Sequence, residues 1–168
     1  YLSFLTTDRR LQAVLIGFVF ASCLEATAGF GTPVAISAAL LIGLGFKPMK
    51  AATLALVSNS APVVFGALAL PLTVGAELTG VNIGKLAQTS ALQLIPLCTI
   101  TPFVMSWIVA GFRDSLKIAP VLIGAGLLFS LSQYGVSLVF NPYLPQLFAS
   151  FILFFSFCLL LRYWRPKT

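Results

Sequence analysis

Residues 24–36 read LEATAGFGTPVAI, and here a long apolar run is broken by an acid, two glycines and a proline. Glycine permits backbone angles that other residues resist, and proline is suited to the first turn of a helix. The stretch therefore predicts that one helix ends near Ala28 and that another starts at Pro33. We interpret the rest of the chain as a scaffold around this break.

The composition identifies the solvent in which the chain folds. Of its 168 residues, 59% are hydrophobic and 8% are charged, whereas roughly 25% are charged in an average globular protein. Apolar runs such as 121–129 and 148–161 approach the ~20 residues that a membrane-spanning helix needs. They do not alternate with polar residues as the strands of a membrane barrel do. We therefore expect an all-α integral membrane protein in a lipid bilayer.

The basic residues fall in four short clusters between the apolar runs. This spacing is typical of the positive-inside rule, so the net charge of +6 does not indicate nucleic-acid binding. If all four clusters are cytoplasmic, each interval between them crosses the membrane an even number of times. The clusters are Arg9 and Arg10, Lys47 and Lys50, Arg113 and Lys117, and Arg162, Arg165 and Lys167.

Three hairpins follow from this topology, with about six membrane-crossing or re-entrant helices. We expect cytoplasmic ends at 1–10 and 162–168, a broken or re-entrant helix pair at 11–46, and helix pairs at 51–112 and 118–161. The polar, glycine-rich stretch 72–90 is predicted to be an external loop within the second pair, whose second half can form a short surface helix. The turn Asn141-Pro142-Tyr143 is predicted to join the two helices of the third pair.

The first interval, 11–46, would be ~54 Å long as one helix, too long for a ~30 Å hydrocarbon core. It must therefore fold back, with each limb slightly short of a full span. Non-helical backbone at membrane depth is tolerated where it is buried in protein or lines a wet cavity. This favours a re-entrant pair whose tip lies inside the membrane.

A second polar stretch lies in the next apolar limb, where Ser58, Asn59 and Ser60 precede Pro62. A proline inside a helix frees a carbonyl, so polar groups are expected at membrane depth. Thr32-Pro33-Val34 and Ala61-Pro62-Val63 are also alike, and paired proline-interrupted segments are typical of transporter sites. Coincidence is the alternative explanation for so short a match.

Glu25 is the acid of the decisive stretch, about 15 residues or ~22 Å of helix from Arg10. Intramembrane acids are costly and usually functional. Burial favours the neutral acid, so Glu25 is a candidate for exchanging a proton during transport. The structural alternative is an acid that stays protonated, or pairs with a lysine, and only holds helices together.

The turn after Glu25 is a candidate anion site. We expect free N–H groups of Val34, Ala35 and Ile36, together with the helix dipole, to attract an anion. Threonine hydroxyls and Asn59 would add hydrogen bonds, and close helix packing is the structural alternative. The candidate substrate-binding residues are Thr27, Gly29, Phe30, Gly31, Thr32, Pro33, Val34, Ser58, Asn59 and Ser60.

Other chemistries lack support in the sequence. There is no histidine, and Cys23, Cys98 and Cys158 lie in apolar runs without CxxC spacing, so we expect no metal site, disulfide or cofactor. No phosphate-binding P-loop occurs. An intramembrane enzyme would need a nucleophile with an activating base, and none is visible.

The residues also carry a resemblance. The chain resembles the bacterial L-lactate permease family in three stretches, densest over residues 10–80. The resemblance implies a secondary transporter that takes up L-lactate, glycolate and related 2-hydroxy monocarboxylates with protons across the bacterial inner membrane. Family members commonly read LEGAAG where Ala26 and Thr27 stand here, which leaves the exact substrate open. The stretches are LE(24–25) with AGFGTPVAI(28–36), GLGFKP(43–48), and NSAPV(59–63) with FGA(65–67).

Joined together, these lines predict a lactate carboxylate at the helix start after Pro33, with Glu25 carrying the coupled proton. Family proteins are much longer and the chain opens at Tyr1 rather than methionine, so we expect a segment whose partner is the rest of a longer permease. The alternatives are a transporter of another anion, sodium-coupled exchange, and a non-transporting membrane fragment.

Overall fold

The computed structural model describes residue 6 and residues 8–163, with the Tyr163 side chain left out. The described residues form helices and turns, without strands, as an all-α membrane protein requires. The predicted cytoplasmic residues 1–5, 7 and 164–168, including Arg165 and Lys167, lie outside the described residues. The helices are α1 (Arg9–Val14), η2 (Leu15–Phe20), α2 (Ala21–Thr27), α3 (Thr32–Gly43), α4 (Pro48–Asn59), η3 (Val63–Phe65), α5 (Gly66–Thr79), α6 (Ile83–Ala110), α7 (Phe112–Leu116), α8 (Ala119–Val139) and α9 (Pro145–Tyr163).

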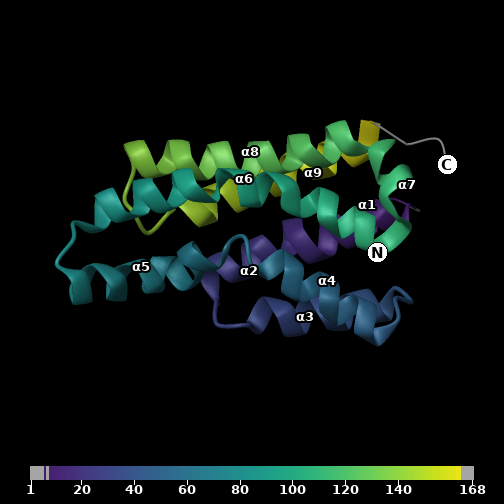
Figure 1. Cartoon of the computed structure of the whole chain (residues 1–168), viewed down its shortest axis with the longest axis horizontal. Coiled ribbons are helices and arrows are strands. Elements are labelled where there is room, and N and C mark those ends of the chain that lie inside the picture. Colours follow the sequence, from purple (N-terminus) through teal and green to yellow (C-terminus); the bar gives the residue numbers. More distant parts are fainter. Residues whose placement is uncertain (1–5, 7, 164–168) are drawn as a thin grey trace.

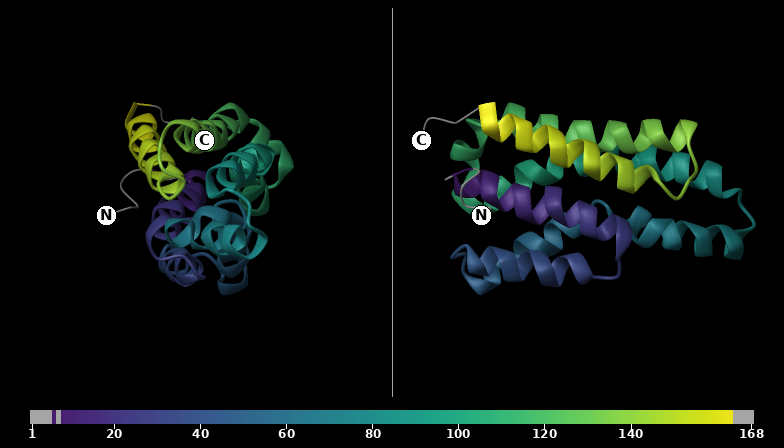
Figure 2. Two further views of the ribbon diagram at one scale, coloured as in Figure 1. Left: turned by 90° about the vertical axis from the view of Figure 1, so that its left-hand side faces the viewer. Right: turned by 180° about the vertical axis from the view of Figure 1, so that it is seen from behind.

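The N-terminal helix forms the centre of the bundle. α1, the π-helical η2 and α2 run together as one 19-residue helix, Arg9–Thr27. Within its most apolar 18 residues, 72% are buried, against 28–39% in the three other helices of spanning length. It packs on α3, α4, α6 and α9. Figure 2 shows it between the α3–α4 pair and the α8–α9 pair. The first limb of the broken pair is therefore long enough to span a membrane, not short as predicted.

The six apolar elements alternate in direction along the bundle (Figure 1). Four helices are long and apolar enough to cross a membrane, and α4 with the η3–α5 segment forms a bent pair with a 66° angle. α3, with 12 residues, is a shorter apolar helix. This arrangement confirms the prediction of about six crossing or re-entrant helices, with a broken pair near the N-terminus.

The described members of the four basic clusters gather at one end of the bundle (Figure 1). Arg9 donates from Nη1 to the Gly45 carbonyl (3.4 Å), which ties α1 to the α3–α4 turn. Lys50 donates from Nζ to the Val109 carbonyl (3.0 Å), which ties α4 to the end of α6. The geometry is that of three hairpins, and the cytoplasmic orientation of this end stays a prediction.

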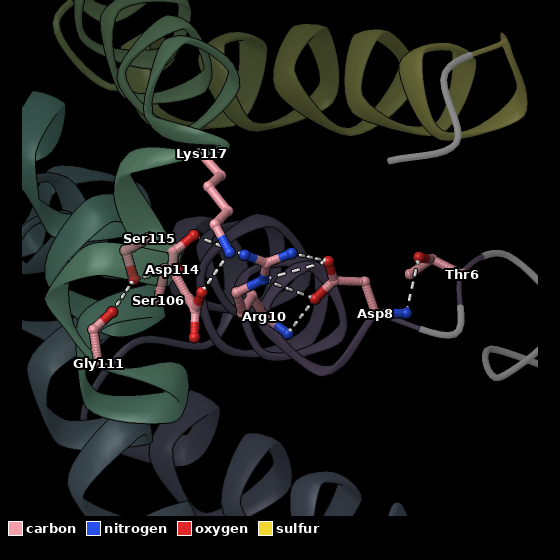
Figure 3. Close-up of polar contacts among 8 residues, drawn as sticks. All are labelled: Thr6, Asp8, Arg10, Ser106, Gly111, Asp114, Ser115 and Lys117. Atoms are coloured by element: carbon pink, nitrogen blue, oxygen red, sulfur yellow. Dashed lines mark hydrogen bonds and ion pairs between the residues drawn. The ribbon is translucent and has the colours of Figure 1, made fainter. Parts of the chain in front are cut away.

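Ion pairs stabilise the same end (Figure 3). Asp8 caps α1 by accepting from the Arg10 backbone N–H (2.8 Å) and pairs with the Arg10 guanidinium. Burial alone would raise the pKa of Asp8, but the hydrogen bonds from Arg10 outweigh it and lower the pKa. On α7, the Lys117 ammonium lies 2.7 Å from the Asp114 carboxylate and lowers its pKa. Arg10 also donates to the Asp114 carbonyl, so the two pairs join α1 to α7.

The stretch 72–90 is mostly helical, and the difference from the expected loop lies in its first half, where α5 continues to Thr79. Residues 67–69 have positive φ angles, so the regular part of α5 starts after them. Pro71 therefore falls in the first regular turn of α5, where its missing N–H costs little. α6 begins already at Ile83 because the Asn82 side chain accepts from the N–H groups of Gly84 (2.9 Å) and Lys85 (3.2 Å). Only a short turn at residues 80–82 separates the two helices.

In the third hairpin, α8 and α9 are joined by a turn in which Asn141 Oδ1 accepts from the Tyr143 N–H (3.0 Å). α8 also lies very close to α6. A Cβ placed on Gly126 of α8 would lie 2.5 Å from the Thr99 carbonyl oxygen and 2.6 Å from that of Cys98. Glycine is therefore required at position 126 for the backbones of α6 and α8 to approach, as small residues do in membrane bundles.

We predict that Gly126→Ala lowers the stability of the purified protein by about 1–3 kcal/mol, because the added methyl forces the two backbones apart. Thermal unfolding in detergent measures the effect. Gly124→Ala is the matched control, since a Cβ on Gly124 of the same helix meets nothing within 4 Å. Equal melting temperatures for the two variants would contradict the close α6–α8 contact.

Candidate functional site

The break predicted from residues 24–36 is present. α2 ends at Thr27, and α3 begins at Thr32 with Pro33 in its first turn. Between them, Gly29 (φ 56°), Phe30 (φ 51°) and Gly31 (φ 84°) adopt left-handed backbone angles that turn the chain back. The tip of this hairpin lies partway along the bundle, well short of the end reached by α5 (Figure 1).

A second break lies in the next limb. α4 ends at Asn59, and after η3 the chain passes through Ala67, Leu68 and Ala69, whose φ angles of 46°, 54° and 60° are all left-handed. Such angles cost about 1–2 kcal/mol per residue that is not glycine. Strain of this kind persists where the surrounding structure holds it, often at functional sites. Pro33 and Pro62, matched in the sequence, both stand beside a break.

The two breaks meet. A Cβ on Gly29 would lie 2.7 Å from the Ala67 Cβ and 2.9 Å from the Ala67 backbone nitrogen. A Cβ on Gly66 would overlap the Glu25 carboxylate and lie 3.1 Å from its carboxyl carbon. The hairpin tip is therefore packed against the start of α5, and Gly66 leaves the space that the Glu25 side chain fills.

Glu25 lies in the last turn of the central helix in a buried position. The residue is 1% exposed, and its Oε2 atom has no hydrogen-bond partner. The ion pairs among the described residues are Arg10 with Asp8 and Lys117 with Asp114, both at the basic end. Among the described residues, no lysine or arginine forms an ion pair with Glu25. This excludes, within that part of the chain, the alternative in which Glu25 pairs with a lysine to hold helices together.

Asn59 is the other candidate residue with a buried, unpartnered oxygen, Oδ1. It lies on the last turn of α4, directly before the second break. Its neighbours are engaged locally, because the Ser58 hydroxyl donates to the Ala55 carbonyl (3.0 Å) and the Ser60 hydroxyl to the Val57 carbonyl (2.7 Å). Among these three candidates, Asn59 has the side chain with capacity left for a ligand.

The predicted cradle of free N–H groups at the start of α3 is wrong. The N–H groups of Val34 and Ala35 both donate to the Gly31 carbonyl, at 3.1 and 3.3 Å, and that of Thr32 donates to the Gly29 carbonyl (3.1 Å). The left-handed Gly31 turns its own carbonyl toward the helix start, so the turn satisfies its donors internally. What remains for an anion is the positive end of the helix dipole.

The other tip residues differ in accessibility. Phe30 is 76% exposed, Thr27, Gly31 and Thr32 are exposed, and Val34 is half-buried. A Cβ on Gly31 would meet nothing within 4 Å. The Thr27 hydroxyl already bonds back to the Leu24 carbonyl (3.2 Å). The structure thus places these residues on the open side of the tip, with Glu25 and Gly29 on its buried side.

Sequence reasoning missed the residues that complete this region. Gly66 and Ala67 contact the tip from the second break. Gln133 of α8 and Gln146 of α9 are fully buried polar residues linked to α2. Glutamine inside an apolar span was an available signal, since polar side chains bond across helices in membranes. The partner of each glutamine was not visible without the fold.

Comparison with known proteins identifies the chain. The sequence pattern of the family described as L-lactate permease matches residues 1–168. The chain belongs to the L-lactate permease family. This permease segment is 43% identical over 164 residues to an L-lactate permease of Bacillus subtilis, and the match covers 98% of the segment. It is 41% identical over 164 residues to the glycolate permease GlcA of Escherichia coli, again over 98% of the segment. An L-lactate permease of the same species is 42% identical over 165 residues, covering 96% of the segment.

The permease segment spans 29% of the length of each of these relatives. The relatives are named as permeases, which points to a transport protein rather than an enzyme. No solved structure matches the chain. The apolar helices and the family together make it a multi-pass membrane protein.

We predict that the open side of the tip faces water. In a variant without the three native cysteines, Thr32→Cys should react with a membrane-impermeant thiol reagent from one side of the membrane, because thiolates form only where water reaches them. Ser37→Cys is the matched control, since Ser37 of the same helix is 0% exposed. Failure of Thr32→Cys to react from either side would mean that lipid or protein covers the tip.

Proposed function

We propose that the permease containing this segment is a secondary transporter that takes up L-lactate, and related 2-hydroxy monocarboxylates such as glycolate, together with protons. The observation that carries the proposal is the unpartnered, buried Glu25 carboxyl group at the point where two helix breaks meet. The named functions of relatives at 41–43% identity support the substrate class.

Proton coupling follows from the surroundings of Glu25. An ionised carboxylate without a partner is very costly in an apolar interior, whereas the neutral acid is tolerated. Glu25 would therefore be protonated when the site is closed, and it would release its proton only when water or a donor reaches Oε2. A group that changes charge with access is suited to coupling a proton to a transport cycle.

The substrate would reach Glu25 from the open side of the tip and bind where the two breaks meet. The positive end of the α3 dipole would attract its carboxylate, and Thr32 and the Asn59 side-chain amide would offer hydrogen bonds. Ionised Glu25 would repel this carboxylate, so substrate binds best after Glu25 takes up a proton. Proton and substrate binding are then reciprocally linked.

The strained Ala67–Ala69 segment supports a conformational role for the same region. Helix breaks that meet at mid-depth allow the segments on either side to move against each other, as in other transporters with broken helices. In this proposal the α2–α3 hairpin is re-entrant, the basic end faces the cytoplasm, and the membrane is the bacterial inner membrane. The remainder of the longer permease chain would provide the opposing wall of the path.

We predict that Glu25→Gln lowers lactate uptake driven by a proton gradient at least ~10-fold and removes its pH dependence, because the neutral amide cannot carry a proton. The measurement is uptake of labelled L-lactate into proteoliposomes that hold the full-length permease, with and without an inward proton gradient. Lactate exchange without a gradient should persist, since Gln mimics the protonated acid.

Glu77→Gln is the matched control, because Glu77 lies on α5 far from the tip, near the opposite end of the bundle. It should transport like the unmodified permease. Gradient-driven uptake and pH dependence that are unchanged in Glu25→Gln would remove the assigned role of Glu25. Uptake that follows a sodium gradient instead of a proton gradient would contradict the assignment of the proton as the coupling ion.

A further inference from the structure

A chain of buried hydrogen bonds joins α8 and α9 to α2, the helix that carries Glu25. Gln133 of α8 donates from Nε2 to Gln146 Oε1 of α9 (2.5 Å), and Gln146 donates from Nε2 to the Ser22 carbonyl of α2 (3.3 Å). Gln133, Gln146 and Ser22 are each no more than 1% exposed. We name this set the amide relay.

The relay has a fixed direction. The Ser22 carbonyl can only accept, so the Gln146 amide must present its NH₂ group to α2 and its oxygen to α8. That oxygen in turn requires the Gln133 NH₂ group. The Gln133 oxygen is thereby forced to the far end of the relay, where Oε1 is buried and has no partner. The relay therefore ends in an acceptor that needs a donor.

The relay reaches the same level of the bundle as Glu25. Ser22 and Glu25 are three residues apart on α2, so they lie about one turn apart on neighbouring faces. Both are buried. A second contact places α8 at this level, because Tyr134 packs on a cluster that contains Phe65. Phe65 directly precedes Gly66, the residue against the Glu25 carboxylate.

Among the described residues, the buried side-chain oxygen and nitrogen atoms without a partner belong to Glu25, Asn59 and Gln133. All three are oxygens. A carboxylate ligand could not satisfy the Asn59 or Gln133 oxygen, because it also only accepts, whereas protonated Glu25 can itself donate. An O–H group is the donor that fits, and a 2-hydroxy acid differs from a plain carboxylic acid by carrying one.

We propose that Gln133 is a specificity-determining residue whose Oε1 accepts a hydrogen bond from the 2-hydroxyl of the substrate. The inference rests on the proposed function and adds the group that distinguishes L-lactate from propionate, which lacks the hydroxyl. Sites built to bond a substrate hydroxyl reject the analogue without it strongly, since the buried polar group is then left unpaired. Gln146 and Ser22 are positioning residues that hold the Gln133 amide in the required orientation.

The test is competition between labelled L-lactate and propionate for uptake by the full-length permease in proteoliposomes. The unmodified permease should prefer L-lactate. Gln133→Leu removes the acceptor at similar volume and should lower the lactate-to-propionate preference at least ~10-fold, with propionate uptake retained. Gln88→Leu is the matched control, because Gln88 also links two helices, donating to the Ser137 carbonyl (3.5 Å), without a buried unpartnered oxygen.

Equal losses of lactate and propionate uptake in Gln133→Leu, or an unchanged preference, would overturn the inference, since Gln133 would then hold helices or bind water. If Gln133→Leu does not reach the membrane, Gln133→Met is scored in the same way, because methionine adapts to irregular sites. An unmodified permease that transports propionate as well as L-lactate would overturn this inference alone. An unmodified permease that transports neither would overturn the proposed function.

Discussion

The buried carboxyl group of Glu25 is the constraint on which the rest of the arrangement depends. It lies in the last turn of the central helix and is 1% exposed, and the described residues give its Oε2 no partner. Gly66 must lack a side chain to leave it room, and Gly29 must lack one so that the tip can approach Ala67. The two helix breaks therefore pack against each other around one buried acid. Burying an acid without a partner would be costly if the acid served packing alone.

The two ends of the bundle contrast with this centre. At the basic end, charges are paired and helix starts are capped, as Asp8 and Arg10 show, so the scaffold is anchored where water is available. At the junction of the breaks, oxygens lack donors and three consecutive residues hold left-handed angles. Proteins place such local conflicts at functional sites and compensate for them elsewhere. A proton and a hydroxyl acid would supply the donors that this centre lacks.

Much of the fold was readable from the sequence because its signals are local. Glycines at 29 and 31 and Pro33 predicted the first break, and the spacing of the basic clusters predicted three hairpins. The error within 72–90 lies in its first half, where polarity was interpreted as a loop although α5 continues to Thr79. The site was only partly readable, because the contacts of Gly66 and Gln133 join segments far apart in the chain, and because the carbonyl of Gly31 takes the N–H groups expected to be free.

Infrared difference spectroscopy of the full-length permease, with and without L-lactate, tests most directly whether Glu25 carries the proton. Comparison of the unmodified protein with Glu25→Gln and Glu77→Gln assigns the stretching band of a protonated carboxyl group. We predict a protonated-carboxyl band that shifts when L-lactate binds, is absent in Glu25→Gln and is retained in Glu77→Gln. The same lactate-induced band in Glu25→Gln would show that the proton resides elsewhere and would contradict the account.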